Sequence, residues 1–382
     1  MKILLVGEYS GFHNSLKKGL IELGHEVTLL ASGDGFKGYP ADIKVDAYLF
    51  RNKFVLRKIK NLIFRIFNID LAGLELLFRI KKHTKNLAPF DVIQFINSNC
   101  FLTKPSIEKK IFLHLSKLSK NRYLHGGGND VYWTNYMLNK HKGYSSLTPY
   151  IKDPSLKPHF LTALKYTQKA YKNYYAFFLN NISGIIPSDM DYQIVYKNTV
   201  KAFEMIPCPI KINELNFEPI VIGEQIKIFC GINTTNQHAK GIPYFLEALA
   251  IIEKKYGKKV EIKITRNLPY KEYIKIYDEA HIFLDQCLSY DQGYNGREAM
   301  AKGKVVFSGA NDDFRTFYNI SEAHMPLIEA KPEVAYLVSK LSELIEDPKK
   351  IHLLSKRARL FIEKEHHYME IAKKYLNTWG LS

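Results

Sequence analysis

Short apolar runs alternate with helical patterns along this chain, and this alternation constrains its fold more than any other feature. Residues 2–7 (KILLVG) have the pattern of a buried strand, residues 13–24 that of a helix ended by Gly24, and residues 25–32 that of the next strand. Strands and helices that alternate in this way build a parallel sheet covered by helices. Further strands are predicted in the first half at 91–97, 121–125, 184–188 and 202–207.

The periodicity disappears around residues 208–223, where two prolines interrupt the chain, and the alternation then restarts. The second half contains predicted strands at 225–231, 259–265, 281–286 and 304–309, and predicted helices at 242–257 and 270–280. The fold class is therefore α/β, with two Rossmann-like doubly wound domains that face each other across a cleft.

A chain of 382 residues is too long for one ordinary core, which agrees with two domains. We expect the first domain at 1–210, a linker at 211–223, the second domain at 224–360, and a C-terminal helix within 361–382 that packs back toward the first domain.

Positive charge is concentrated in the first half of the chain, where residues 51–90 hold ten basic and two acidic side chains. Residues 54–67 within this segment have a helical pattern with one apolar face, made of Val55, Ile59, Leu62 and Ile66. The other face carries the predicted membrane patch, Arg57, Lys58 and Arg65. Such a helix can lie in the headgroup layer of an anionic membrane, although an ordinary core-facing helix has the same pattern. No nucleic-acid binding motif accompanies the charge, so nucleic acid is not an expected partner.

The four cysteines lie far apart and form no C-x-x-C pair, which argues against a zinc site and a disulfide framework and favours a reducing compartment. The first apolar run is too short for a signal peptide, and no window is apolar over the length of a membrane span. The sequence therefore predicts a cytoplasmic protein that is peripheral at the inner face of the cell membrane.

Residues 291–306 (DQGYNGREAMAKGKVV) carry the most informative local pattern, with Gly293 and Gly296 flanking the point where a loop enters a short helix. The first amides of a helix have no intrahelical partner and its dipole is positive there, so a diphosphate can bind at this end. Glu298 lies one turn further, where its carboxylate can accept the two vicinal hydroxyls of a ribose. A helix stabiliser in the first turn is the alternative role for Glu298.

The sequence GREAMAKGKVV, which follows HIFLDQ and is preceded by AKGIPYFLEAL, resembles the donor-binding domain of the retaining GT-B glycosyltransferases. The resemblance is to the large family-4 (glycosyl transferases group 1) type of capsule and O-antigen biosynthesis. It covers nearly the whole chain and is strongest at 226–309. It implies that Glu298 binds the nucleotide ribose and that the turn before it lies against the diphosphate. The donor site predicted from the turn consists of Gly293, Tyr294, Asn295 and Gly296.

The family usually has a second glutamate eight positions before the first, in contact with the donor sugar. This chain has Tyr290 at that position and Asp291 beside it, so the motif is broken or shifted by one residue. Asp291 is therefore a candidate catalytic residue.

Lys240, in the run NQHAKGI, matches the lysine with which the family neutralises the donor phosphates. The arginine that usually accompanies it is replaced by the neutral run INTTN. The second positive charge then has to come from Arg266, Arg297 or His238. Gln286, at the end of a predicted strand, either holds a base or hydroxyl of the donor or caps the strand.

Two glycine-containing loops of the first domain are expected to line the cleft. One is GEYSGFHNS (7–15), and the other is LHGGGNDVYW (124–133), where three successive glycines leave space for a ligand. The predicted cleft residues are Gly11, Phe12, Gly127 and Asn129. His125 is placed where some relatives present a histidine to the transferred sugar, and it is the second candidate catalytic residue. A histidine satisfied at a strand end is the alternative.

No carboxylate pair with the arrangement of a glycoside hydrolase is identifiable, so positioning and electrostatics are expected to supply the rate. No clustered carboxylates suggest a metal on the diphosphate, and no cofactor is expected. The predicted function is transfer of a sugar from a nucleotide-diphosphate sugar to a lipid-linked or oligosaccharide glycan acceptor in bacterial surface polysaccharide synthesis, with the anomeric configuration retained. A sugar-nucleotide epimerase and a non-catalytic glycan-binding protein of the same fold are the alternatives.

Overall fold

The computed structural model describes residues 1–35 and 38–380, and for Tyr270 and Lys271 it describes only the backbone. In these residues the first sheet has the order β3-β2-β1-β4-β5-β6, with all neighbouring strands parallel. Its strands are β1 (Lys2–Val6), β2 (Glu26–Ala31), β3 (Ile43–Lys44), β4 (Val92–Phe95), β5 (Arg122–Gly126) and β6 (Gly184–Pro187).

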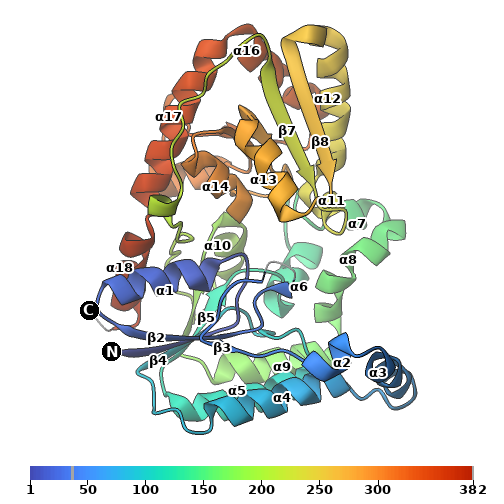
Figure 1. Cartoon of the computed structure of the whole chain (residues 1–382), viewed down its shortest axis with the longest axis vertical. Coiled ribbons are helices and arrows are strands. Elements are labelled where there is room, and N and C mark those ends of the chain that lie inside the picture. The colour runs from blue at the N-terminus through green and yellow to red at the C-terminus, as the bar shows by residue number, and fades with distance from the viewer. Residues whose placement is uncertain (36–37, 381–382) are drawn as a thin grey trace.

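The second sheet has the order β11-β10-β9-β7-β8 and is also parallel. Its strands are β7 (Ile226–Ile232), β8 (Val260–Arg266), β9 (Ile282–Leu284), β10 (Val305–Ser308) and β11 (Ile328–Glu329). The prediction of two Rossmann-like α/β domains is confirmed, and the two layered units are visible in Figure 1.

Helices cover the faces of both sheets (Figure 1). The helices of the first domain are α1 (Phe12–Glu22), α2 (Tyr48–Asn52), α3 (Phe54–Phe67), α4 (Leu71–Thr84), α5 (Pro105–Leu115), α6 (Val131–Asn139), α7 (Thr148–Lys152), α8 (Lys157–Leu164), α9 (Lys169–Asn180) and α10 (Met190–Tyr196). Those of the second half are α11 (Gln237–Lys240), α12 (Ile242–Tyr256), α13 (Tyr270–Glu279), α14 (Tyr294–Ala301), α15 (Asp312–Tyr318), α16 (Val334–Glu346), α17 (Pro348–Glu365) and α18 (Tyr368–Thr378).

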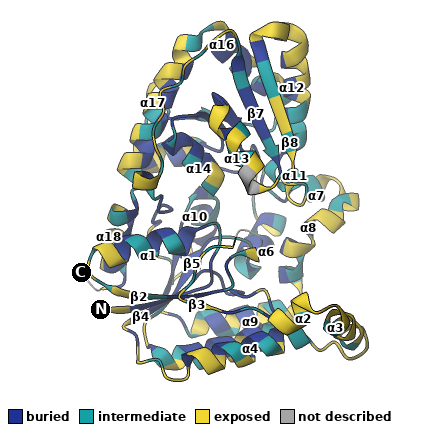
Figure 2. Ribbon diagram, in the orientation of Figure 1, coloured by how far each residue is buried: buried dark blue, intermediate teal, exposed yellow. Residues whose placement is uncertain are grey.

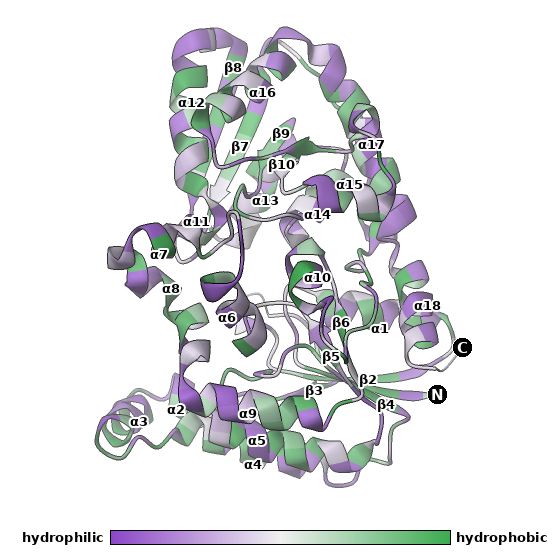
Figure 3. Ribbon diagram, turned by 180° about the vertical axis from the view of Figure 1, so that it is seen from behind, coloured by the Kyte–Doolittle hydropathy of each residue, from purple (hydrophilic) through white to green (hydrophobic). Residues whose placement is uncertain are grey.

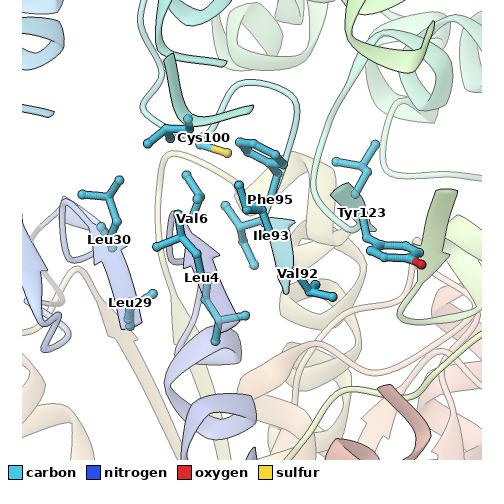
Figure 4. Close-up of a cluster of buried hydrophobic side chains, with 14 of the residues drawn as sticks. Leu4, Val6, Leu29, Leu30, Val92, Ile93, Phe95, Cys100 and Tyr123 are labelled. Carbon is cyan, nitrogen blue, oxygen red and sulfur yellow. The ribbon is translucent and has the colours of Figure 1, made fainter. Parts of the chain in front are cut away.

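The core of the first domain is built on β1, whose residues 3–6 are all 0% exposed. A central strand of a parallel sheet is covered on both faces, which explains why this strand is a continuous apolar run. Figure 4 shows Leu4 and Val6 of β1 between Leu29 and Leu30 of β2 and the side chains of β4.

Alternate residues of β7 belong to two different apolar clusters, one on each face of the second sheet. Ile228 and Cys230 pack with residues of α12 and α16. Phe229 packs on the other face with residues of α13, α14 and α17. The second cluster also includes Trp133 and Met190 of the first domain, so the apolar core continues from one domain to the other.

The chain crosses between the domains twice, and the two crossing segments are hydrogen-bonded to each other. The backbone N–H of Ile210 donates to the carbonyl of His366 at 2.8 Å, and the N–H of Tyr368 donates back to Ile210. After the second crossing, α18 packs on α1 (Figure 1). A Cβ on Gly19 of α1 would lie 2.6 Å from the carbonyl oxygen of Tyr368, so the two helices can approach this closely only at a glycine.

Two sequence predictions are corrected by the fold. The predicted C-terminal unit at 361–382 begins too early, because α17 continues to Glu365 and the returning helix begins at Tyr368. The predicted strand at 202–207 forms only an isolated bridge between Ile185 and Ala202. This segment runs beside β6, and the N–H groups of Phe203 and Ile206 donate hydrogen bonds to it. These two donors are three residues apart, whereas the donors of a regular parallel strand pair are two residues apart, so no continuous strand pairing forms.

The predicted basic helix is α3, with the bounds Phe54–Phe67, and none of its residues is buried. Its apolar face is exposed, with 65% exposure for Val55, 59% for Leu62 and 62% for Ile66. Figure 2 shows α3 exposed at the edge of the first domain, and Figure 3 shows hydrophobic and hydrophilic residues mixed around it. The alternative of a core-facing helix is therefore wrong. None of the helices in the described residues combines the length and apolarity needed to span a bilayer.

Candidate functional site

The carboxylate of Asp285 organises the loops at the carboxyl edge of the second sheet. It follows β9, is 2% exposed, and accepts hydrogen bonds from three different segments. Lys240 Nζ of α11 donates to it at 2.8 Å, the N–H of Gly293 at 3.0 Å, and the hydroxyl of Ser308 on β10 at 2.9 Å. Asp285 thus brings the predicted phosphate-binding lysine to the amino end of α14.

Gly296 is a glycine because of this carboxylate. A Cβ at Gly296 would lie 2.7 Å from Oδ2 of Asp285, closer than real Cβ contacts come. Gly293 is the N-cap of α14, and its own amide is already bonded to Asp285, so it is not one of the amides available to an anion. The first-turn amides that remain for a ligand are those of Tyr294, Asn295 and Gly296.

Glu298 is half-buried and is the fifth residue of α14, which begins at Tyr294. It therefore lies beyond the first turn, which weakens its alternative role as a first-turn stabiliser. Burial, and after it the charge of Glu298, raises the pKa of Tyr277 on α13. The Tyr277 hydroxyl also donates to the carbonyl of Asn295 at 3.4 Å. The carboxylate of Glu298 is thus close to α13.

The three candidates for a second positive charge have different positions. Arg297 is only 1% exposed and forms an ion pair with Asp291, Nη2 to Oδ1 at 3.1 Å, so the prediction that it can face a phosphate is wrong for this arrangement. Arg266 ends the edge strand β8 and is exposed. His238 of α11 packs on His159 of α8, with 4.6 Å between the ring centroids.

Gln286 lies beside the glycine turn and donates through Nε2 to the carbonyl of Asp291 at 3.0 Å. Its oxygen is near Gly293, since a Cβ there would be 3.6 Å from Oε1. In this arrangement the side chain supports the turn. Lys240, whose side chain is 26% exposed, is the cation that this edge of the sheet presents beside α14.

Tyr290 and Asp291 do not face the cleft but join the two domains. The N–H of Tyr290 donates to the carboxylate of Asp191 at 3.1 Å, and the N–H of Met190 donates to Oδ2 of Asp291 at 3.1 Å. We call these four residues together with Arg297 the interdomain clasp. Asp291 is 1% exposed, so in this arrangement it binds Arg297 and α10 and has no access to a sugar.

The Tyr290 ring extends the same junction into the first domain. Its hydroxyl donates to the carbonyl of Tyr144 at 2.6 Å and lies 2.9 Å from Nε2 of His141. A Cβ on Gly143 would come within 2.9 Å of this hydroxyl. The residue that replaces the family's sugar-binding glutamate therefore fills a slot between the domains.

His125 and Phe12 are placed inside the first domain. The two rings pack at a centroid distance of 3.9 Å, and the residues are 6% and 3% exposed. Burial lowers the pKa of His125 well below its ordinary value, so the ring is neutral. The prediction that Phe12 lines the cleft is wrong here, because it belongs to the apolar core.

The glycine loops have structural partners of their own. Gly11 is the N-cap of α1 and has a φ of 85°, which favours glycine. The carbonyls of Gly127 and Asn129 accept hydrogen bonds from the side-chain amide of Asn97 at 3.1 and 3.3 Å. Gly127 leaves room for His125, whose Nε2 would lie 2.2 Å from a Cβ at that position.

A cavity of about 930 Å³ lies elsewhere, lined by residues between 214 and 225, which overlap the predicted linker, and also by His281, Lys302 and Lys304. These three residues are at the amino ends of β9 and β10, the edge opposite to Asp285. Doubly wound sheets bind their ligands at the carboxyl ends of the strands, so we do not assign the donor to this cavity despite its size. Among the described residues no group of three or more His, Cys, Asp or Glu side chains could hold a metal ion.

Residues 234–377, which include Lys240, Asp285 and Glu298, match the family model described as glycosyl transferase-like. Residues 234–377 therefore carry a glycosyl transferase-like domain. The enzyme class and the family resemblance predicted from the sequence are thereby confirmed. No curated protein has a matching sequence.

Solved structures with low identity share the fold of this chain over its whole length. Sucrose-phosphate synthase from Thermosynechococcus elongatus has a TM-score of 0.62 at 14% identity, with 100% of both chains covered. Anabaena HepE in complex with UDP-glucose has a TM-score of 0.56 at 12% identity, covering 100% of this chain and 99% of that one. UDP-GlcNAc 2-epimerase from Neisseria meningitidis has a TM-score of 0.50 at 13% identity, with 100% of both covered.

Proposed function

We propose that this protein transfers a sugar from a nucleotide-diphosphate sugar to a glycan acceptor, with the nucleotide bound at the amino end of α14. The observation that carries the proposal is the group held by Asp285 inside the matched segment. One carboxylate joins the partly exposed cation of Lys240 to a helix end, and Glu298 lies one turn away. Cation and helix amides suit a diphosphate, and a carboxylate suits the ribose hydroxyls.

The proposed chemistry relies on charge and positioning. As the bond to the sugar breaks, negative charge grows on the leaving diphosphate, where Lys240 and the first-turn amides can stabilise it. These groups supply the positive charge from the chain itself, so the proposal includes no metal and no cofactor. Retention of the anomeric configuration is part of the proposal through the family resemblance. Neither His125 nor Asp291 is given a catalytic role in the arrangement described, because both are buried.

A solved UDP-GlcNAc 2-epimerase has a similar fold, so epimerisation of a sugar nucleotide is a second candidate function. An epimerase converts its sugar nucleotide without an acceptor, whereas a transferase releases the nucleoside diphosphate only as it transfers. We favour transfer because the family model that matches residues 234–377 is that of glycosyl transferases.

We further propose a lipid-linked acceptor at an anionic membrane surface, reached through α3. Large apolar side chains are exposed from α2 to α4, namely Tyr48, Leu49, Phe54, Val55, Ile59, Leu62, Phe64, Ile66, Phe67, Ile69, Leu74 and Phe78. Arg57, Lys58 and Arg65 lie among them and are exposed too. An exposed helix with both apolar and basic faces is suited to the boundary of headgroups and acyl chains. This surface fits a protein that acts in surface polysaccharide synthesis at the inner face of the cell membrane.

The test is release of nucleoside diphosphate from UDP-glucose, UDP-N-acetylglucosamine, UDP-galactose and GDP-mannose, with and without a bacterial lipid extract or octyl glucoside as acceptor. We expect release from at least one donor to increase when an acceptor is added. Conversion of the donor to its epimer without acceptor would favour the epimerase instead. If no donor is bound or consumed, the proposed function is wrong.

A further inference from the structure

Glu8 is a buried carboxylate that the sequence patterns do not single out. It follows β1 in a loop that turns sharply, with positive φ angles of 83° at Gly7, 56° at Ser10 and 85° at Gly11. The residue is 3% exposed. Its Oε2 accepts hydrogen bonds from the backbone N–H of Asn14 at 2.8 Å and from its side-chain amide at 2.6 Å. Its Oε1 is buried and has no hydrogen-bond partner among the described residues.

An unpartnered buried oxygen of this kind is costly, since buried polar groups are almost always hydrogen-bonded. Glu108 of the same domain shows how a buried carboxylate usually obtains hydrogen-bond partners. It is 2% exposed, and one of its oxygens accepts bonds from the N–H groups of Phe101 and Thr103 and from the Thr103 hydroxyl. Asn14, by contrast, fixes only one oxygen of Glu8.

The helix that follows the loop of Glu8, α1, contacts the first residue of α14 in the proposed donor site. The hydroxyl of Tyr294, the first residue of α14, is 2.7 Å from the hydroxyl of Ser15 on α1 and donates to the carbonyl of Pro209 at 2.5 Å. Glu8 is close enough for its charge to act on Tyr294. The carboxylate therefore belongs to the first-domain side of the junction whose other side is the amino end of α14.

We propose that Oε1 of Glu8 accepts a hydrogen bond from the acceptor hydroxyl that attacks the sugar, so that this residue contacts the acceptor during transfer. The inference rests on the proposed function, because it places the acceptor opposite a diphosphate at α14. The side chain of Tyr294 has to move aside to admit the acceptor. The hydrogen bond positions the hydroxyl and requires the ionised carboxylate. The hydroxyl oxygen bonds to the anomeric carbon as the bond from that carbon to the diphosphate breaks, and the hydroxyl proton passes to an oxygen of the leaving diphosphate.

The surroundings of Glu8 set the pH at which it is ionised. Burial raises its pKa to about 7. The two hydrogen bonds from Asn14 and the backbone N–H of His13 oppose this, and the charge of Asp34 adds to it. His13, whose pKa is lowered by burial to about 4, is neutral and contributes no charge. Tyr294 of α14 contacts Ser15 of α1, and the charge of Glu8 acts on it. Transfer should therefore decrease as the pH falls through about 7, where the carboxylate gains its proton.

The experiment compares Glu8→Gln with the full-length wild type, using the donors and acceptors named above. We expect kcat/KM for the acceptor to fall about 10- to 100-fold, the loss of one hydrogen bond to a charged group. The decrease in kcat/KM as the pH falls through about 7, which is the acidic limb of the pH–rate profile, should disappear in this variant. The dissociation constant of UDP or GDP should stay within about twofold of the wild-type value. Glu108→Gln is the control, because it neutralises an equally buried carboxyl and should retain the limb.

Each outcome decides the inference. A wild-type enzyme that transfers, with a Glu8→Gln variant of equal kcat/KM or an unchanged acidic limb, overturns the role of Glu8 and leaves the proposed function intact. A wild-type enzyme that consumes no donor overturns both. Should Glu8→Gln fail to fold by circular dichroism, Glu8→Asp replaces it. That variant keeps the charge but shortens the reach, so an unchanged KM for the acceptor would also contradict the proposal.

Discussion

At the scale of single residues, the site depends on contacts that the addition of one side-chain atom would disrupt. Asp285 holds Lys240, α14 and β10 together through three hydrogen bonds, and Gly296 leaves the space for it. The motif at 291–306 contains Gly296 but gives no reason why this residue must be a glycine. The reason is steric and comes from Asp285, which lies eleven residues earlier in the chain, just after β9.

Gly296→Ala should therefore destabilise the second domain and displace the carboxylate. Its Cβ would meet Oδ2 of Asp285 at 2.7 Å, and relief of such a clash costs about 1–3 kcal/mol. The free energy of unfolding in urea measures the loss. Gly223→Ala, where a Cβ meets nothing within 4 Å, is the control and should change the stability by no more than about 0.5 kcal/mol. Equal effects of the two variants would show that the Asp285 contact does not constrain residue 296.

Glu298→Ala should weaken binding of the nucleotide without unfolding the protein. Loss of the hydrogen bonds to a ribose corresponds to a rise of about 10- to 100-fold in the dissociation constant, measured by calorimetry with UDP and GDP. Glu272→Ala removes an exposed acidic residue from the first turn of the neighbouring helix α13 and should leave affinity unchanged. Unaltered affinity of the Glu298 variant for every nucleoside diphosphate that binds the wild type would remove the ribose assignment.

At the scale of elements, α3 differs from every other long helix of the first domain because none of its residues is buried. The half-buried positions are Leu56, Lys60 and Ile63, which face the rest of the domain. The face predicted from the sequence as apolar points instead to solvent. A helix that keeps such a face without a core needs another partner.

Replacing Arg57, Lys58 and Arg65 by Ser should reduce binding to phosphatidylglycerol vesicles by about 3 kcal/mol at low salt, with about 1 kcal/mol from each charge. Co-sedimentation measures it, and binding of the wild type should weaken as salt is added. Stability should remain within about 0.5 kcal/mol because α3 buries no side chain. Lys254, Lys258 and Lys259, exposed in the second domain, provide the matched triple replacement. If both triple variants bind vesicles like the wild type, α3 is not the membrane contact.

At the scale of the whole molecule, buried charge joins the two domains. The interdomain clasp contains the carboxylates of Asp191 and Asp291, and Asp189 is their neighbour. Arg297 is the cation among these three carboxylates. Burial, followed by the charge of Asp291, raises the pKa of Asp189 to about 7, while Arg297 opposes this. Because carboxylates outnumber cations at this junction, the stability of the joined domains depends on pH.

The sign of this dependence follows from the raised pKa. Between the unfolded pKa of about 3.9 and the folded pKa of about 7, the native state binds more protons than the unfolded state, so stability decreases as pH rises through this window. Asp189→Asn removes the charge. The variant should gain stability over the wild type above about pH 7 and show no gain near pH 4, measured by denaturation across that range. A difference that is constant over the range would contradict the assignment.

The sequence by itself determined the local structure of this protein. The alternation of apolar runs and helical patterns predicted both sheets, the amphipathic segment 54–67 matches α3 at both ends, and the short helix after Gly293 is α14. These features depend on neighbours within a few residues, so a one-dimensional pattern records them. The same pattern could not exclude 202–207 as a strand, because a strand also needs a partner in register.

Only the tertiary structure decided which way the chemically active side chains face. Arg297, Asp291, His125 and Phe12 all occupy positions that a motif can mark as functional, yet packing between elements places them in the interior. Glu8 and Asp285 acquired their roles in the same way, from partners that lie 6 to 45 residues away in the chain. The direction of a side chain relative to a cleft depends on how two domains pack, and contacts between distant segments set that packing.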